Sequence, residues 1–193
     1  MKILFVLILL LSSPLGNAQV PDSVRTYHWG ELPAEFDADT IISLSFYKMK
    51  LDSLPDSLEF FENLQYLNLG KNRLTELPNY FSKFISLKIL NFEKNRFDVF
   101  PLVICQLESL ERLIVNRNFI SRIPDCIEYA ESLEYIDFYD NPISYVPESF
   151  ERLHNLKKVD FSGVKFGPSF QRKWITRMPD VEFVFEAPCD CME

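Results

Sequence analysis

The chain has 193 residues, a formal net charge of −8 at pH 7 and a sequence pI near 4.9. Acidic residues predominate before residue 41 and after residue 179, whereas the segment between them is close to neutral. Binding to nucleic acid or to an anionic membrane requires a net basic face, so this distribution argues against both partners.

The first 18 residues have the pattern of a secretory signal peptide. Lys2 supplies a positive charge, residues 3–11 form an apolar run, and Gly16 and Ala18 have the spacing of a cleavage site. The run is too short to span a bilayer, although an uncleaved N-terminal anchor is the alternative. We therefore expect a secreted protein, extracellular or periplasmic, without membrane insertion after cleavage.

Residues 19–40 contain an incomplete version of a pattern that the following segment repeats in full. Leu32, Pro33 and Phe36 have the order of half a repeating unit, and Trp29 precedes them. Because a stacked array needs terminal units that cover its exposed core, we expect residues 19–40 to form an N-terminal cap.

From residue 41 to residue 163 a 23-residue pattern recurs about six times, with copies that begin at residues 41, 64, 87, 110, 133 and 156. Its template is LxxLxLxxNxLxxLPxxIxxLxx, and residues 64–86 match it most clearly. In the first five copies every apolar position holds an apolar residue, and position 15 is always proline. A fixed period of this length indicates stacked units that share one core.

Each part of the template predicts a local structure. The LxxLxL segment alternates apolar and polar residues, which predicts a short strand with one buried face. Proline at position 15 suits the start of a short helical or 3₁₀ return arm. The asparagine at position 9 follows the strand, where its amide can bond open backbone groups and link neighbouring coils. These structural asparagines are Asn72, Asn95, Asn118 and Asn141.

These features resemble the leucine-rich repeat family, in its 23-residue LPxxI variety. The resemblance covers residues 41–163 well and the two ends loosely. It implies an α/β fold, a leucine-rich repeat solenoid, in which a right-handed superhelix of strands and α or 3₁₀ segments curves with its parallel sheet on the concave face. It also implies a non-catalytic module that recognises a protein or peptide partner through that face.

The resemblance places strand positions 3, 5, 7 and 8 on the binding face. Position 8 is a basic row of Lys48, Lys71, Lys94 and Arg117. The candidates at the other positions are Tyr47, Tyr66, Asn68, Asn91, Glu93, Arg112, Tyr135, Asp137, Tyr139 and Asp160. We expect Tyr135 and Tyr139 to anchor the partner without supporting the fold, and we expect Asn116 at position 7 to point into solvent.

Two other functions stay open. Tyrosines beside Asn and Asp also suit a glycan-binding or cell-surface adhesion module, and a passive scaffold is a third possibility. Catalysis is disfavoured because the chain has two histidines, five glycines and no known catalytic motif. We therefore expect no enzyme, no cofactor and no metal site.

Four cysteines bear on the compartment. Cys105 and Cys126 lie on adjacent return arms, where they either form a disulfide or stay buried and reduced. Cys189 and Cys191 lie in the tail, too far along the stack to reach Cys126. Those two can close a small loop, pair with another chain or bind a soft metal, although no further Cys or His stands near them.

Residues 164–193 depart from the template and are expected to form a C-terminal cap and tail. Ser169 is predicted to cap a short helix, and residues 181–185 are predicted to form a last strand. The helix is expected to carry on one face Phe170, Trp174, Ile175 and Met178.

Overall fold

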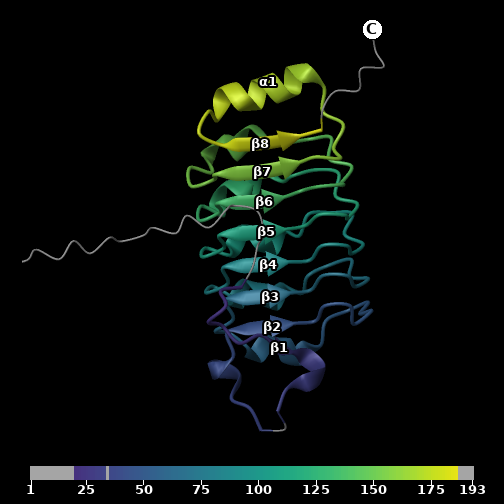
Figure 1. Cartoon of the computed structure of the whole chain (residues 1–193), viewed down its shortest axis with the longest axis vertical. Coiled ribbons are helices and arrows are strands. Elements are labelled where there is room, and N and C mark those ends of the chain that lie inside the picture. The colour runs from purple at the N-terminus through teal and green to yellow at the C-terminus, as the bar shows by residue number, and fades with distance from the viewer. Residues whose placement is uncertain (1–19, 34, 187–193) are drawn as a thin grey trace, which may run out of the picture.

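The structure is a computed structural model that describes residues 20–33 and 35–186. Its eight strands form one parallel sheet in the order in which they occur in the chain (Figure 1). The strands are β1 (Tyr27–His28), β2 (Ser43–Ser45), β3 (Tyr66–Asn68), β4 (Ile89–Asn91), β5 (Arg112–Ile114), β6 (Tyr135–Asp137), β7 (Lys158–Phe161) and β8 (Glu182–Phe185). Leu67 pairs with Leu44 on one side and with Leu90 on the other, so each step along the sheet is one 23-residue repeat. The predicted fold class is confirmed.

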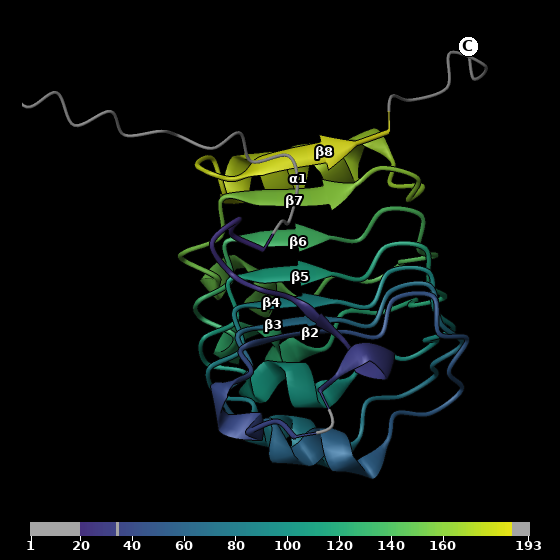
Figure 2. The same cartoon turned by 60° about the horizontal axis from the view of Figure 1, so that its bottom comes forward.

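The return arms are short 3₁₀ segments on the side of each coil opposite its strand (Figure 2). Each begins directly after the proline of template position 15, whose missing N–H costs the turn nothing. The N–H of Leu58, for example, donates to the carbonyl of Pro55 at 3.0 Å. The segments are η3 (Asp56–Phe60), η4 (Asn79–Lys83), η5 (Leu102–Gln106), η6 (Asp125–Tyr129) and η7 (Glu148–Arg152).

The core lies between the sheet and the return arms and is continuous through the whole stack. Leu90 from a strand and Phe81 from a return arm are both fully buried. Phenylalanine also fills the interior between coils, and the rings of Phe138 and Phe161 stack with centroids 5.4 Å apart. Because each coil covers its neighbour's apolar side, the coils cannot bury their cores singly.

Each position-9 asparagine links its own coil to the preceding one. Nδ2 of Asn95 donates to the carbonyls of Leu69 and Phe92, both at 3.0 Å, and its Oδ1 accepts the N–H of Leu74 at 3.0 Å. Asn72, Asn118 and Asn141 repeat this arrangement. The side chains satisfy backbone groups that the turn leaves open inside the protein, where an unpaired group is costly.

Tryptophans close both ends of the core. At the N-terminal end, beside η1 (Trp29–Glu31) and η2 (Ala38–Thr40), Trp29 stacks on Phe46 with ring centroids 4.7 Å apart. At the other end, α1 (Pro168–Arg177) buries Trp174, whose ring contacts Phe150.

Two details of the predicted C-terminal helix are wrong. Gly167 is the N-cap residue of α1 and Pro168 is its first residue, so Ser169 lies inside the helix and does not cap it. Proline takes the first position because its N–H would have no helical acceptor there. Ile175 is 51% exposed and therefore does not belong to the buried face.

Cys105 and Cys126 form a disulfide between η5 and η6, with Cα atoms 5.7 Å apart. The expected leader and the expected tail cysteines, Cys189 and Cys191, lie outside the described residues. Within residues 20–33 and 35–186, no helix has the length and apolarity needed to cross a membrane.

Candidate binding face

A second apolar cluster lies on the strand face, the side of the sheet that points away from the core. It consists of Tyr66, Ile89, Ile114 and Tyr135, which are all buried, and we call it the strand-face cluster. Ile89 follows Tyr66 at template position 3 in the sheet register, and Ile114 occupies position 5 of the next coil. Four apolar side chains from consecutive strands thus meet on a face that the repeat pattern alone would leave to polar residues.

The N-terminal segment, residues 20–26, covers part of this face. It runs across the front of the sheet toward β1, as the purple ribbon in Figure 2 shows. Val20 and Val24 pack against the strand-face cluster, and Oγ1 of Thr26 lies 2.8 Å from Oγ of Ser43. A hollow of about 280 Å³ remains between the segment and the strands.

Polar side chains at position 5 stabilise the turn that follows each strand. Oδ1 of Asn68 accepts the N–H of Gly70 at 2.9 Å, and Oδ1 of Asn91 accepts that of Glu93 at 2.8 Å. The same bond to the residue two places on recurs from Ser45, Asp137 and Asp160. Short polar side chains form this turn readily. The predicted position-5 binding residues therefore also hold the backbone.

Ile114 is the exception at position 5. Its side chain has no acceptor for the N–H of Asn116, and that N–H has no other acceptor in the part of the chain that the structure describes. The isoleucine instead adds its apolar surface to the strand-face cluster, where it is buried. At this one coil a backbone hydrogen bond is replaced by an apolar contact on the outer face of the sheet.

Asn116 is buried, at 8% exposure, and the expectation that it points into solvent is wrong. Its Nδ2 donates to Oδ2 of Asp137 on the next strand at 2.5 Å, which holds the side chain against the sheet. Burial raises the pKa of the Asp137 carboxyl above its usual value, although the hydrogen bonds from Asn116 and from the Tyr139 N–H act in the opposite direction.

Tyr135 is 8% exposed and forms part of the strand-face cluster, so the expectation that it has no structural role is wrong. Burial, with the carboxylates of Asp137 and Asp160, raises the pKa of Tyr135 to about 12. The guanidinium of Arg112 lies over the Tyr135 ring, 4.7 Å from its centroid. Nε and Nη2 of Arg112 are buried and have no hydrogen-bond acceptor among the described residues.

The basic row of position 8 lies where the chain turns away from the strands. Its four residues have positive φ between 52° and 61°, and each N–H donates to the position-7 carbonyl of the next coil. Lys48 and Lys71 lie near the Tyr47 ring, at 5.2 and 4.9 Å from its centroid. The row therefore belongs to the edge of the sheet at which the strands end.

Comparison with known proteins agrees with this geometry. The Leucine Rich Repeat family model matches residues 63–84 and 132–153, which are parts of two coils. The fold is a leucine-rich repeat solenoid. A solved leucine-rich repeat protein of Leptospira interrogans superposes with a TM-score of 0.55 and 22% sequence identity, over 76% of this chain and 44% of that one. The chain thus spans less than half the length of that protein. No curated protein matches the sequence.

The leucine-rich repeat register brings most of the predicted binding residues onto one face but does not make them equivalent. Tyr66 and Tyr135 are buried, Tyr47 and Tyr139 are half-buried, and Lys48 and Arg117 are exposed at the edge. Sequence reasoning missed the covering Val20 and Val24, which precede the repeats and follow no period. It also missed the role of Ile114, although an apolar residue in a polar column was a readable signal.

No group of three His, Cys, Asp or Glu side chains within the described residues could hold a metal ion. The solenoid's most unusual polar groups are instead the unpaired Arg112 donors on the strand face. Together with the neighbouring apolar cluster they are suited to recognition, in which apolar contact provides affinity and a fixed polar group provides orientation.

Proposed function

We propose that this chain is a non-catalytic binding module that recognises a protein or peptide through its strand face, centred on β3–β6. Leucine-rich repeat domains generally mediate protein–protein interactions, which supports the class of function. The observation that carries the proposal for this chain is Ile114. It gives up a backbone hydrogen bond that the other coils make at this position and gains only apolar surface on the outer face of the sheet.

Residues that depart from a locally stabilising sequence pattern occur mainly at functional sites. An unpaired buried N–H costs on the order of 1–3 kcal/mol, and an Asn at position 114 would avoid that cost. Asn occupies the same position in the two preceding coils, as Asn68 and Asn91. A role of Ile114 in recognition explains why the coil that begins at residue 110 differs from the others.

The N-terminal segment shows what kind of ligand fits. Residues 20–26 lie across the sheet without helix or strand structure and place Val20 and Val24 against the strand-face cluster. We infer that the partner presents a similar segment with apolar side chains and displaces residues 20–26 when it binds. While no partner is bound, residues 20–26 keep the apolar cluster covered.

Arg112 adds a charge preference to this proposal. Its Nε and Nη2 are buried without an acceptor, whereas buried donors in native proteins are nearly always bonded. A carboxylate from the partner can accept from both nitrogens in the forked geometry that arginine favours. We therefore propose that the recognised segment carries an acidic residue beside its apolar ones.

The glycan alternative has less support on this face. Sugar recognition was expected from open tyrosine rings, but Tyr66 and Tyr135 are buried in the cluster. Secretion stays a proposal. The signal-peptide pattern and the Cys105–Cys126 disulfide both favour an oxidising compartment such as the periplasm or the extracellular space.

Selection from a displayed peptide library tests the proposed function. The full chain, without its leader, is compared with Arg112→Met, which keeps the aliphatic packing and removes the charge, and with Phe60→Glu on the opposite side of the coil. Phe60 is 64% exposed on η3. Wild type and Phe60→Glu should select the same peptides, apolar with an acidic residue, and Arg112→Met should lose the acidic preference. Loss of binding in Phe60→Glu alone would place the interface on the return arms.

A further inference from the structure

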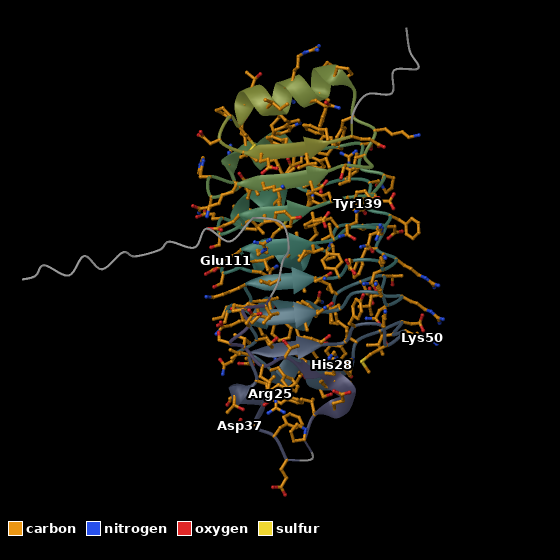
Figure 3. All side chains as sticks on the ribbon, in the orientation of Figure 1. Arg25, His28, Asp37, Lys50, Glu111 and Tyr139 are labelled. Atoms are coloured by element: carbon orange, nitrogen blue, oxygen red, sulfur yellow. A yellow bond between two sulfur atoms is a disulfide. The ribbon has the colours of Figure 1, made fainter. Side chains whose placement is uncertain are left out.

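Seven basic residues form two parallel rows along the edge of the sheet at which β2–β5 end. We call them the edge ladder: Lys48, Lys71, Lys94 and Arg117 at template position 8, with Lys50, Arg73 and Arg96 at position 10. Figure 3 shows Lys50 projecting from this edge, and Glu111 lies at the opposite edge. Because four consecutive coils contribute at position 8 and the first three of them also at position 10, the charges recur at the coil spacing of about 4.8 Å.

Most cations of the edge ladder have no carboxylate partner among the described residues, although the protein as a whole is acidic. Elsewhere most basic side chains have carboxylate partners, including Lys83 with Glu59 at 3.0 Å and Lys157 with Glu134 at 2.7 Å. Within the ladder, only Arg73 and Arg117 approach a carboxylate, and each does so at 4.0 Å. The other five make no ion pair among the described residues, although Glu76, Glu93 and Asp98 lie in the same coils.

Backbone geometry gives a second reason to regard these cations as functional. Position 8 has positive φ in every coil, a conformation that Gly, Asn and Asp adopt more easily than Lys or Arg. The last two coils use such residues, Asp140 and Gly163, at this position. The backbone therefore does not require the lysines, and a role for their side chains accounts for them.

A hollow of about 770 Å³ continues the ladder at its C-terminal end. Arg117 and Lys165 lie on its border, and Phe119, Pro142 and Phe166 supply apolar walls. Phe119 follows Arg96 in the position-10 row and is 61% exposed. An exposed aromatic ring beside a row of cations suits a ligand that has ring-shaped units as well as regular negative charge.

We propose that the edge ladder and this hollow bind a linear acidic polysaccharide with a carboxylate on each sugar. One negative charge per sugar ring gives the ligand a repeat comparable to the coil spacing, and an apolar sugar face can lie against the exposed ring of Phe119. Nucleic acid fits less well. A duplex strand has phosphates every 3.4 Å or so, and single strands need open aromatic platforms along the charged path. The ladder's neighbouring ring, Tyr47, is covered by Lys48 and Lys71.

The test uses oligogalacturonate, which has one carboxylate on every sugar, and the same oligomer after methyl esterification as the uncharged control. The full chain without its leader is compared with Lys71→Gln/Lys94→Gln. The matched control is Lys83→Gln/Lys157→Gln, which removes the same charge elsewhere. The ladder variant should bind the acidic oligomer about tenfold more weakly, and the slope of log affinity against log salt should fall by about two. The control should bind like the wild type.

Phe119→Ser tests the hollow separately and should weaken binding of the acidic oligomer without changing the salt slope. Equal binding of the esterified oligomer, or equal loss in the Lys83/Lys157 control, would overturn the proposal. So would a single-stranded oligodeoxynucleotide that binds as tightly and depends on the same lysines. Peptides selected by the strand face should bind the Lys71→Gln/Lys94→Gln variant normally, so the two proposals can fail independently.

Discussion

Asn116 and Asp137 are joined across neighbouring coils, with 2.5 Å between Nδ2 of Asn116 and Oδ2 of Asp137. Oδ1 of the same carboxyl accepts the N–H of Tyr139 at 2.9 Å. Despite both bonds, burial raises the pKa of Asp137 above its usual value. A raised pKa means that the folded state favours the protonated acid, so the stability contributed by Asp137 is fully present below its unfolded pKa of about 3.9. That contribution is lost as the pH rises through the folded pKa.

Asp137→Asn should therefore gain stability relative to the wild type as the pH rises from about 4 toward neutrality. The variant has no carboxyl to ionise at this position, so it avoids the cost of a buried charge. Urea unfolding of both proteins at several pH values measures the difference between their free energies of unfolding. A difference that stays constant with pH, or that moves in favour of the wild type, would contradict the raised pKa.

Asn95→Ala should lower the free energy of unfolding by about 2 kcal/mol or more. The change leaves buried backbone groups unpaired in two neighbouring coils, at on the order of 1–3 kcal/mol for each. Asn155→Ala is the control, because this exposed amide donates only to the carbonyl of Glu131. It should cost less than about 0.5 kcal/mol. Urea midpoints that shift equally for both variants would remove the linking role of Asn95.

Replacement of Cys105 and Cys126 by alanine should lower the free energy of unfolding by about 3 kcal/mol. The disulfide closes a loop between residues 21 apart in the sequence, and loops of this length restrict the unfolded chain by about that amount. Chemical unfolding under non-reducing conditions provides the measurement. A double variant as stable as the wild type would show that the two thiols are not linked in solution.

Val20→Ser with Val24→Ser should uncover the strand-face cluster without unfolding the solenoid. The two valines pack on the cluster from outside the repeat array, so their loss weakens only the covering segment. Binding of the fluorescent dye ANS should increase while the melting temperature changes little. Val99→Ser, at a highly exposed position, is the control and should leave dye binding unchanged. Unchanged dye binding in the double variant would mean that residues 20–26 do not protect this face.

The sequence was sufficient for the solenoid because its signals are local and repeat with a fixed period. Apolar spacing defines the strands, Pro55 and its equivalents define the return arms, and Asn95 and its equivalents define the turns. The burial of Tyr135 and Asn116 was not readable in the same way. It depends on a segment outside the repeats and on a bond between coils, and neither follows the template. Ser169 was misjudged because Pro168 can begin the helix without a side-chain cap.

The most direct test of the proposed recognition is Ile114→Asn. The new side chain can accept the N–H of Asn116, as Asn68 and Asn91 accept the equivalent groups, and this gain offsets the lost apolar contact. The free energy of unfolding should therefore stay within about 1 kcal/mol of the wild type. Titration calorimetry with peptides selected on the wild type should show binding weakened about tenfold or more. Undiminished binding by a folded Ile114→Asn variant would contradict the claim that the strand-face cluster is the recognition surface.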